Sequence, residues 1–345
     1  MARIVIAGAG ATGASIAYHL ALLGARDVVL CDRGGVASGS TGKAMGGVRQ
    51  QFSTAPEVRL AQESIRFFAD LGEPLFQQVG YVFVASTDDG LAELEERQAL
   101  QAGLGVPVER VDAGAIPGLA VGDVIGAYGC WEDGVADPPA VARELVRRAL
   151  EFGVDLQEGI DAREVNGDVL VIACGPWSGE LADLPIRPLC RQLVDTTPVQ
   201  GLPADLPMVI EAETGFHFRR AGEGLRLAMV EPTLRWGFEE RVDEELVADW
   251  LQRLARRYPP AADARVARAW AGLYDMTPDA HPIIGWVDDG VYAACGFSGH
   301  GFMQSPAVGR AAAEEILGRE SPFDLTPFRL ERFAGDAVFP ERLVL

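Results

Sequence analysis

The sequence is poor in the residues that build metal sites and disulfide frameworks. It has only five cysteines and four histidines in 345 residues. The cysteines, at positions 31, 130, 174, 190 and 295, are scattered and form no Cys-x-x-Cys pair. We therefore expect reduced thiols in a cytoplasmic protein, with no metal site and no disulfide framework.

Basic residues and long apolar runs are scarce as well. Lysine and arginine total 30 against 50 aspartates and glutamates, which gives a net charge of −20. A chain this acidic is repelled by phosphate backbones and anionic membrane faces, so we expect neither nucleic acid nor membrane as a partner. No apolar run approaches the ~20 residues of a membrane-spanning helix. Glycines interrupt the apolar N-terminus, which argues against a signal peptide there.

Glycine, by contrast, is abundant, and a compact glycine motif opens the chain. The apolar, β-branched run Arg3–Ala7 predicts a buried strand, and Ala14–Leu23 has helical spacing. Between them lies GAGATG, from Gly8 to Gly13. Val28–Cys31 predicts a second buried strand, which places Asp32 at its carboxyl end.

Each part of this motif suits the binding of a dinucleotide. Gly8 makes a tight turn, Gly10 lets the backbone approach a pyrophosphate, and Gly13 lets the helix pack on the strand. The helix N-terminus stabilises phosphates. Asp32 follows Gly13 by 19 residues, where it can accept hydrogen bonds from a ribose diol. The motif does not separate NAD from FAD, and a glycine-rich turn without a ligand is the structural alternative.

The middle of the chain predicts a first domain interrupted by a β-rich insertion. The polar segment 34–47 stands where an NAD-binding domain would continue with another strand–helix unit, and a flexible surface linker is its alternative reading. Helices are predicted over 56–71, 90–105 and from 138 onward, and the strand 169–173 leads into Gly175. Short strand-like pieces between 187 and 271 predict the inserted domain. A length of 345 residues suits two domains.

A second glycine-rich loop, CGFSGHGFMQSPAVG, occupies residues 295–309. A strand is predicted over 291–294, directly before it, and a helix from about Met303, directly after it. The amides at the start of that helix would face the edge of the sheet. They would stabilise an anion, or a negative charge that develops during a reaction.

At this point the sequence resembles the D-amino-acid oxidase superfamily of FAD enzymes. The matching pieces span nearly the whole chain in the order found in the superfamily. They are the Gly8–Gly13 motif with Asp32, GSTGKAMGGVRQQF (39–52), VLVIACGPWSGEL (169–181), GFHFRR (215–220), LYDMTPDAHPIIG (273–285) and GFSGHGF (296–302). The nearest branch holds sarcosine oxidase, the β subunits of sarcosine oxidase and L-proline dehydrogenase, dimethylglycine dehydrogenase and glycine oxidase.

The resemblance implies an α/β fold, α+β overall, in which a Rossmann-like FAD-binding domain carries an inserted β-sheet substrate domain. The expected division is 1–78, 130–186 and 275–345 for the first and 79–129 and 187–274 for the second. The implied reaction oxidises the C–N bond of a small, secondary or N-alkyl amino acid by hydride transfer to flavin N5, and the imine then hydrolyses. Oxygen or a partner chain would take the electrons. Two alternatives are a β-type dehydrogenase subunit that needs a partner, and a non-catalytic assembly or regulatory flavoprotein.

The resemblance also implies which residues contact FAD. These are Gly8, Gly10, Ala11, Thr12, Gly13, Asp32, Arg33, Ser40, Thr41, Lys43, Ala44, Met45, Gly46, Gly47, Ala173, Gly175, Gly299, His300, Gly301, Phe302 and Met303.

Three departures from the relatives refine this expectation. Gly272 replaces the cysteine that holds the flavin covalently in monomeric sarcosine oxidase, and Lys43 replaces the histidine that does so in dimethylglycine dehydrogenase. We therefore expect non-covalent FAD. Met303 replaces a lysine that helps to bind the carboxylate of sarcosine, which leaves room for a bulkier, more apolar substrate.

Four residues are candidates for contact with the substrate: Arg49, His300, Phe218 and Met303. Arg49 matches a carboxylate-binding arginine of sarcosine oxidase, and a structural ion pair is the alternative. His300 could donate to the flavin, contact the substrate or only brace its loop. His217 and Phe218 fall on a strand where the family places active-site side chains, although a core or surface position is the favoured reading for His217.

Overall fold

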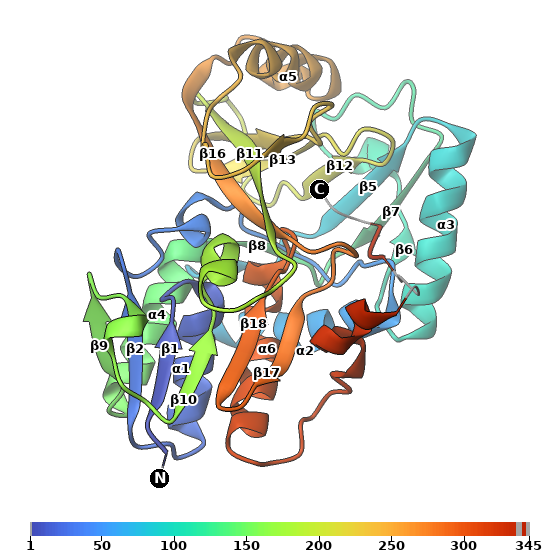
Figure 1. Cartoon of the computed structure of the whole chain (residues 1–345). Helices are drawn as coiled ribbons and strands as arrows, with labels where there is room; N and C mark the ends of the chain where they lie inside the picture. Colours follow the sequence, from blue (N-terminus) through green and yellow to red (C-terminus); the bar gives the residue numbers. More distant parts are fainter. Residues whose placement is uncertain (1, 336–339, 343–345) are drawn as a thin grey trace.

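The glycine motif follows a strand in the interior of a six-stranded sheet (Figure 1) in a computed structural model that describes residues 2–335 and 340–342. In spatial order the sheet consists of β17 (Ile283–Asp288), β18 (Val291–Cys295), β10 (Val169–Ile172), β1 (Ile4–Ala7), β2 (Val28–Asp32) and β9 (Asp155–Glu158). The neighbours run parallel except β17, which is antiparallel to β18. The apolar run of β1 is buried throughout, as in parallel strands covered on both faces.

Four α-helices pack with one another beside this sheet. They are α1 (Ala11–Leu22), α2 (Ala55–Leu71), α4 (Pro138–Glu151) and α6 (Gly301–Ile316). Helix α1 contacts both α4 and α6, and α6 also contacts α2. An ideal Cβ on Gly309 of α6 would lie 2.1 Å from the hydroxyl oxygen of Ser15, so the two helices approach closely only because this residue is glycine. The close packing of α1 and α6 brings their N-termini to the same edge of the sheet.

A larger sheet of nine strands forms the upper part of the molecule in Figure 1. Its spatial order is β15 (Arg235–Trp236), β11 (Arg187–Thr196), β14 (Gly224–Ala228), β13 (His217–Ala221), β12 (Met208–Glu211), β5 (Tyr81–Ala85), β7 (Gly126–Cys130) and β6 (Glu109–Arg110), with β16 (Val266–Met276) paired to β11. A short sheet of β3 (Gly47–Val48), β8 (Gly134–Ala136) and β4 (Phe76–Gln77) is separate from it.

Helix α5 (Glu244–Arg257) packs its apolar side against the larger sheet, and α3 (Asp88–Gly103) contacts β5 and β7. Trp250 and Leu254 of α5 share a buried core with Phe216 and Phe218. The Asp243 side chain caps α5 by accepting from the amides of Glu245 and Leu246. The helix therefore begins where the sequence changes from loop to amphipathic spacing.

The prediction of a mixed α/β fold is confirmed, and most element bounds agree to within two residues. Helices expected over 56–71 and 90–105 span 55–71 and 88–103, and the helix expected from about 303 begins at 301. The strands of the nine-stranded sheet come from residues 81–130 and 187–276. The boundaries of the two domains stay a prediction.

Candidate functional site

A cavity of about 480 Å³ lies between the six-stranded sheet and the nine-stranded sheet. At one end it is lined by residues that end or follow parallel strands, among them Ala7, Asp32 and Ala173. At the other end it is lined by strands of the nine-stranded sheet, with Tyr81 and His217. Ligands of open α/β sheets bind at the carboxyl ends of the strands, and the cavity has the size of a cofactor or substrate site.

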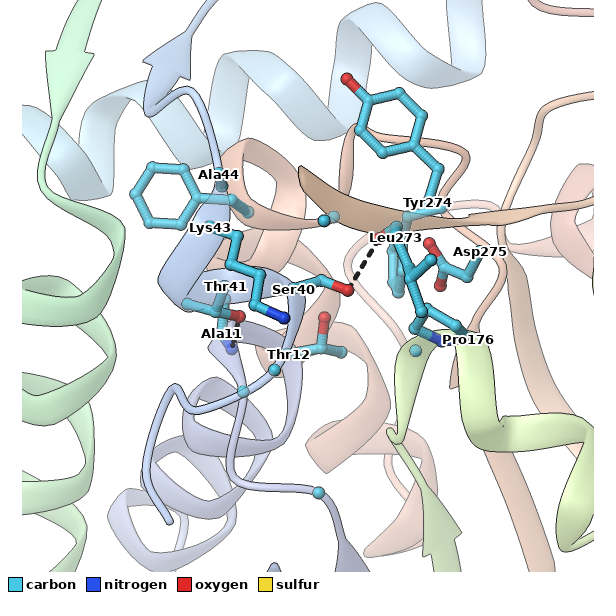
Figure 2. A pocket seen from close by; sticks show the side chains of 18 of the residues that line it. Ala11, Thr12, Ser40, Thr41, Lys43, Ala44, Pro176, Leu273, Tyr274 and Asp275 are labelled. Carbon is cyan, nitrogen blue, oxygen red and sulfur yellow. Dashed lines mark hydrogen bonds between the residues drawn. The ribbon is translucent and has the colours of Figure 1, made fainter. Parts of the chain in front are cut away.

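The turn between β1 and α1 is shaped by glycine. Gly8 has φ +104°, and an ideal Cβ on it would lie 2.5 Å from the carbonyl oxygen of Ala173. Gly13 lies behind the cavity, where a Cβ would be 1.8 Å from the carbonyl oxygen of Gly8, so this glycine serves the packing of α1. The first turn of α1 has no acidic side chain, and Thr41 Oγ1 accepts from the Ala11 amide at 3.0 Å (Figure 2). Gly10, Ala11 and Thr12 line the cavity, so the positive end of the helix faces it.

Asp32 lies at the end of β2 and fixes the turn from both sides. Its two carboxylate oxygens accept from the amides of Ala9 (2.7 Å) and Gly34 (2.8 Å). Each carboxylate oxygen has more than one acceptor position, so Asp32 can still accept hydroxyl hydrogens from the cavity that it lines. The neighbouring Arg33 donates to Glu180 at 2.9 Å.

The polar segment 34–47 is part of the cavity wall. Ser40, in the short 3₁₀ helix η1 (Ser40–Lys43), donates to the carbonyl of Leu273 at 2.7 Å (Figure 2). Lys43 forms an ion pair with Glu240, and Trp270 Nε1 donates to the Lys43 carbonyl at 3.0 Å. The bonds to Leu273 and Trp270 tie the segment to β16, so it is not the flexible surface linker considered as an alternative.

The glycine-rich loop before α6 is held by a buried carboxylate. Asp275 accepts from the Gly296 amide at 2.7 Å, and its carbonyl accepts from the Ser298 amide at 3.1 Å. Burial raises the pKa of Asp275 to about 6, although bonds from the loop amides act in the opposite direction. Gly299 has φ +95°, and a Cβ there would lie 2.4 Å from the Tyr274 ring. The loop is therefore closely packed against Tyr274 and Asp275.

Helix α6 begins at Gly301, two residues earlier than the sequence predicted, and its N-terminus lies on the cavity wall. Its first turn has no acidic side chain and no side-chain cap. Pro306 lacks the amide that would bond to the Phe302 carbonyl, and Ser305 Oγ donates to that carbonyl instead, at 2.9 Å. Two helix N-termini, those of α1 and α6, thus face one cavity, and both favour an anion there.

Arg49 and His300 lie side by side on the cavity wall. Arg49 is 2% exposed, donates to the Gln51 carbonyl and places its guanidinium carbon 4.3 Å from the centre of the Phe52 ring. Its Nη2 is 3.4 Å from His300 Nε2. Burial lowers the pKa of Arg49 from its usual value. The side chain thus brings a desolvated cation to the cavity.

His217 and Phe218 are neighbours in sequence but face opposite sides of β13. His217 lines the cavity, and burial lowers its pKa to about 4, so the ring is neutral. Its Nδ1 lies 2.7 Å from the Gly215 carbonyl, to which it donates, and this leaves Nε2 as an acceptor. Phe218 is fully buried, 5.6 Å from Tyr258 between ring centres, in the core beneath α5. Phe218 is therefore a packing residue, which corrects the expectation that it contacts the substrate.

Comparison with known proteins identifies the family. Residues 3–315 match the family model described as FAD dependent oxidoreductase (DAO). The chain belongs to this family. FAD-dependent oxidoreductase domain-containing protein 1 of Bos taurus is 29% identical, with 96% of this chain and 84% of the relative aligned. Glycine oxidase of Geobacillus kaustophilus is 26% identical over 96% of this chain and 97% of its own.

A solved structure of L-proline dehydrogenase from P. horikoshii superposes on the DAO chain with a TM-score of 0.89, at 26% identity. The superposition covers 98% of this chain and 99% of that one. The protein is thus an FAD-dependent oxidoreductase of the DAO family, and membership implies a flavin cofactor.

In this DAO protein the cavity collects nearly all the residues predicted from the sequence. Every predicted FAD contact lines it except Gly13. Of the four candidates for substrate contact, Arg49, His300 and Met303 line it and Phe218 does not. Sequence reasoning missed further lining residues: Tyr81, Arg191, Met208, Met229 and Tyr274. Tyr81, Arg191 and Met208 lie on strands, where only the spacing of side chains could have signalled them, whereas Tyr274 lies in the segment 273–285 and Met229 directly follows β14.

The described part of the DAO protein has no helix that could span a membrane, no metal-binding cluster and no disulfide. Within 2–335 and 340–342, no helix is long and apolar enough to cross a membrane. In the same part of the chain, no group of three or more His, Cys, Asp or Glu side chains is placed to hold a metal ion. All five cysteines lie in the described part and are free thiols.

Proposed function

We propose that the protein oxidises the C–N bond of a small amino acid, secondary or N-alkyl, with FAD. The observation that carries this proposal is one cavity that joins the glycine turn and two helix N-termini to a chamber lined by buried arginine and histidine side chains. The first part suits an anionic dinucleotide, and the second suits a carboxylate substrate.

The residues present fit FAD. A Cβ on Gly10 would meet only Thr41 Oγ1, at 3.1 Å, so the backbone there stands open to a pyrophosphate. Asp32 would hold the ribose of the adenosine part of FAD. The linker between the two ring systems of FAD would be lined by Ser40–Gly47 and Ala173–Gly175. The start of α6, Gly299–Met303, would stabilise negative charge on the flavin. When bound, FAD supplies the hydride acceptor, its N5 atom.

The chain's own residues would orient the amino acid and keep its nitrogen neutral. Cationic side chains around the chamber disfavour a second positive charge, so they lower the pKa of a bound amine. The neutral His217 offers an acceptor to an N–H group. A neutral amine can give up hydride from its α carbon, and water then hydrolyses the imine product.

We infer that FAD is held without a covalent bond. Gly272 and Lys43, the two positions of covalent links in relatives, face each other: an ideal Cβ on Gly272 would be 3.0 Å from the Lys43 Cβ. Neither residue offers a thiol or an imidazole. Acid precipitation of the purified protein should leave a colourless pellet and release all the flavin to the supernatant. A yellow pellet would contradict this.

The experiment that tests the function is an anaerobic absorption spectrum of the flavoprotein, before and after L-proline, sarcosine, glycine and D-alanine are added in turn. Bleaching of the flavin by one of them supports the proposal and names the substrate group. A flavin that none of them bleaches would argue for the non-catalytic alternative. Buffer without amine, incubated for the same time, is the control.

The electron acceptor divides the proposal into two forms. An oxidase passes its electrons to oxygen, whereas a β-type dehydrogenase subunit passes them to a partner chain or a dye. Glycine oxidase and L-proline dehydrogenase are both among the relatives, so the family holds both types. Oxygen consumption during turnover, compared with dye reduction in its absence, separates them. Location in the cytoplasm remains a proposal from composition.

A further inference from the structure

One buried arginine on the cavity wall has donor atoms without a partner. Arg191, on β11, lines the cavity and is 8% exposed. Within the described part of the chain, no hydrogen-bond partner is found for its Nε and Nη1 atoms. Buried donors that stay unpaired are costly, because they lose their bonds to water and gain none. A group that enters the cavity is the natural partner for them.

The other strongly buried arginines differ from Arg191. Arg257 donates to Glu211 and Asp123, and Arg219 donates to the carbonyls of Met45 and Arg220. Arg97 also has an unpaired nitrogen. However, it does not line the cavity, and it has Glu93 at 3.9 Å. Arg191 alone among these five-donor side chains combines unpaired atoms, within the described residues, with a position on the cavity wall.

The pairing of β11 with β16 determines which way Arg191 faces. Arg191 is directly opposite Gly272, and opposed residues of antiparallel strands share a face. Tyr274, two residues along β16, lies on that face too. In Figure 2 the Tyr274 ring projects from β16 to the side opposite Pro176. The guanidinium carbon of Arg191 is 5.8 Å from the centre of this ring, which also packs against Gly299. Arg191 therefore faces the region where α6 begins.

The charged groups near Arg191 are either already paired or positive. Glu231 is 2% exposed, accepts from the Gln192 amide at 3.1 Å and is bound through both oxygens by Arg235. Burial raises the pKa of Tyr274, and positive charge from Arg191 and Arg49 opposes that rise, so both arginines are close to this phenol. Two desolvated cations near one ring make this chamber a place for an anion.

We propose that Arg191 is the residue that binds the carboxylate of the substrate, with Arg49 as a second cation near Tyr274. This inference rests on the proposed function, which it deepens. A guanidinium can bind both oxygens of a carboxylate. The assignment makes the substrate an amino acid and not a plain amine. It also explains how a carboxylate can bind where Met303 stands in place of a lysine.

The test compares an amino acid with the amine that lacks its carboxylate. Substrate reduction of the flavin is measured anaerobically with L-proline against pyrrolidine, or sarcosine against dimethylamine, whichever pair reacts. Arg191→Gln should lower kcat/KM for the amino acid by about 30-fold or more and leave the plain amine within about twofold. Arg191→Lys should fall between, because it keeps the charge but not the paired donors. Arg187→Gln, an exposed residue of the same strand outside the cavity wall, should match the wild type.

A binding measurement keeps this inference separate from the proposed function. Pyrrole-2-carboxylate, with pyrrole as its uncharged counterpart, is titrated while the flavin absorption band is followed. Binding of the acid that weakens about 30-fold in Arg191→Gln supports the inference even if no amine reduces the flavin. If both Arg191 variants reduce the flavin normally and keep the preference for the amino acid, the proposed function stands and the inference about Arg191 is wrong. Loss of the preference in Arg49→Gln alone, or no binding of the acid by the wild type, would also overturn the inference.

Discussion

At the scale of single residues, glycine decides where a ligand can approach the backbone. Gly8 and Gly13 have no room for a side chain because other backbone atoms occupy it. Gly10 is different: its φ is −75°, and only Thr41 Oγ1 is near its Cβ position. Any residue could adopt that backbone, so the space beside Gly10 serves the cavity and not the fold.

Replacement of Gly10 by Leu should therefore remove the cofactor and keep the fold. The side chain would fill the space that a pyrophosphate needs, and FAD affinity should fall by more than about tenfold. The ratio of flavin absorption to protein absorption after purification measures the loss. Gly103→Leu, at the exposed end of α3, is the matched control. A Gly10→Leu protein that stays yellow would remove the turn from the cofactor site.

Asp133 is a residue whose charge should show in the pH dependence of stability. Its side chain is fully buried and accepts hydrogen bonds from the Gln50 backbone amide (2.9 Å) and from Gln51 Nε2 (3.0 Å). Gln50 and Gln51 directly follow Arg49 in the sequence. Burial raises the pKa of Asp133 from 3.8 to about 6. Between these two pH values the folded protein holds a proton that the unfolded chain has lost. The contribution of Asp133 to stability therefore falls as pH rises through this window.

The substitution Asp133→Asn removes this titration. The advantage of the wild type over the variant should shrink as pH rises through the window, by at most about 3 kcal/mol. Thermal unfolding of both proteins across that pH range measures the difference. Asp70→Asn, on the exposed side of α2, is the matched control. A constant difference between wild type and Asp133→Asn would mean that Asp133 is ionised in the folded state throughout.

At the scale of elements, the alternation of side chains along β13 places one residue at the cavity and its neighbour in the core. His217 and Phe218 are adjacent, yet one faces the cavity and the other the core beneath α5. Sequence motifs mark such strands without stating which of two neighbours faces the ligand.

Substitutions at these two neighbours should therefore have opposite effects. Phe218→Ala should lower the free energy of unfolding by about 3–5 kcal/mol, because it leaves a cavity in a close-packed core. Its flavin content, measured well below the unfolding temperature, should be close to normal. His217→Gln should cost little stability but lower kcat/KM for the amino acid. Urea unfolding and anaerobic reduction of the flavin, measured on both variants, give the two readouts. If Phe218→Ala lowered kcat/KM with little loss of stability and His217→Gln lowered stability instead, the two roles would be exchanged.

At the scale of the whole molecule, the cavity lies between the two large sheets, so a ligand in it contacts both. The six-stranded sheet contributes the ends of its parallel strands, and the nine-stranded sheet contributes Tyr81, Arg191 and His217. Apart from the cavity, each sheet has a core of its own. A cofactor that contacts both parts stabilises the folded chain as a unit.

Removal of FAD should therefore lower the stability of the whole chain. At free FAD about 100 times its dissociation constant, linkage gives about 2.7 kcal/mol of added stability. The melting temperature of apoprotein should rise steadily as FAD is added, and the Gly10→Leu variant should show a smaller rise at the same FAD concentration. Wild-type apoprotein whose melting is independent of FAD would count against a site between the sheets.

The sequence by itself determined the parts of the site that depend on local backbone chemistry. The role of a glycine between a strand and a helix depends on residues close to it in sequence. Gly8, Gly10, Asp32 and Gly299–Met303, all singled out from the sequence, line the cavity, whereas Gly13 packs behind it. Periodicity likewise determined most helices to within two residues, because apolar spacing reflects burial on one face.

Only the tertiary structure decided which strand residues face the cavity. Arg191 meets Tyr274 because β11 pairs with β16 in one register, and a shift of one residue would turn Arg191 away from that face. His217 and Phe218 were separated by the packing of α5 against one face of the sheet. Such contacts join residues far apart in the chain, and no local pattern encodes them. The glycine turn between β1 and α1 thus depends on residues close together in the sequence. The substrate chamber depends instead on the pairing of strands that are far apart in the chain.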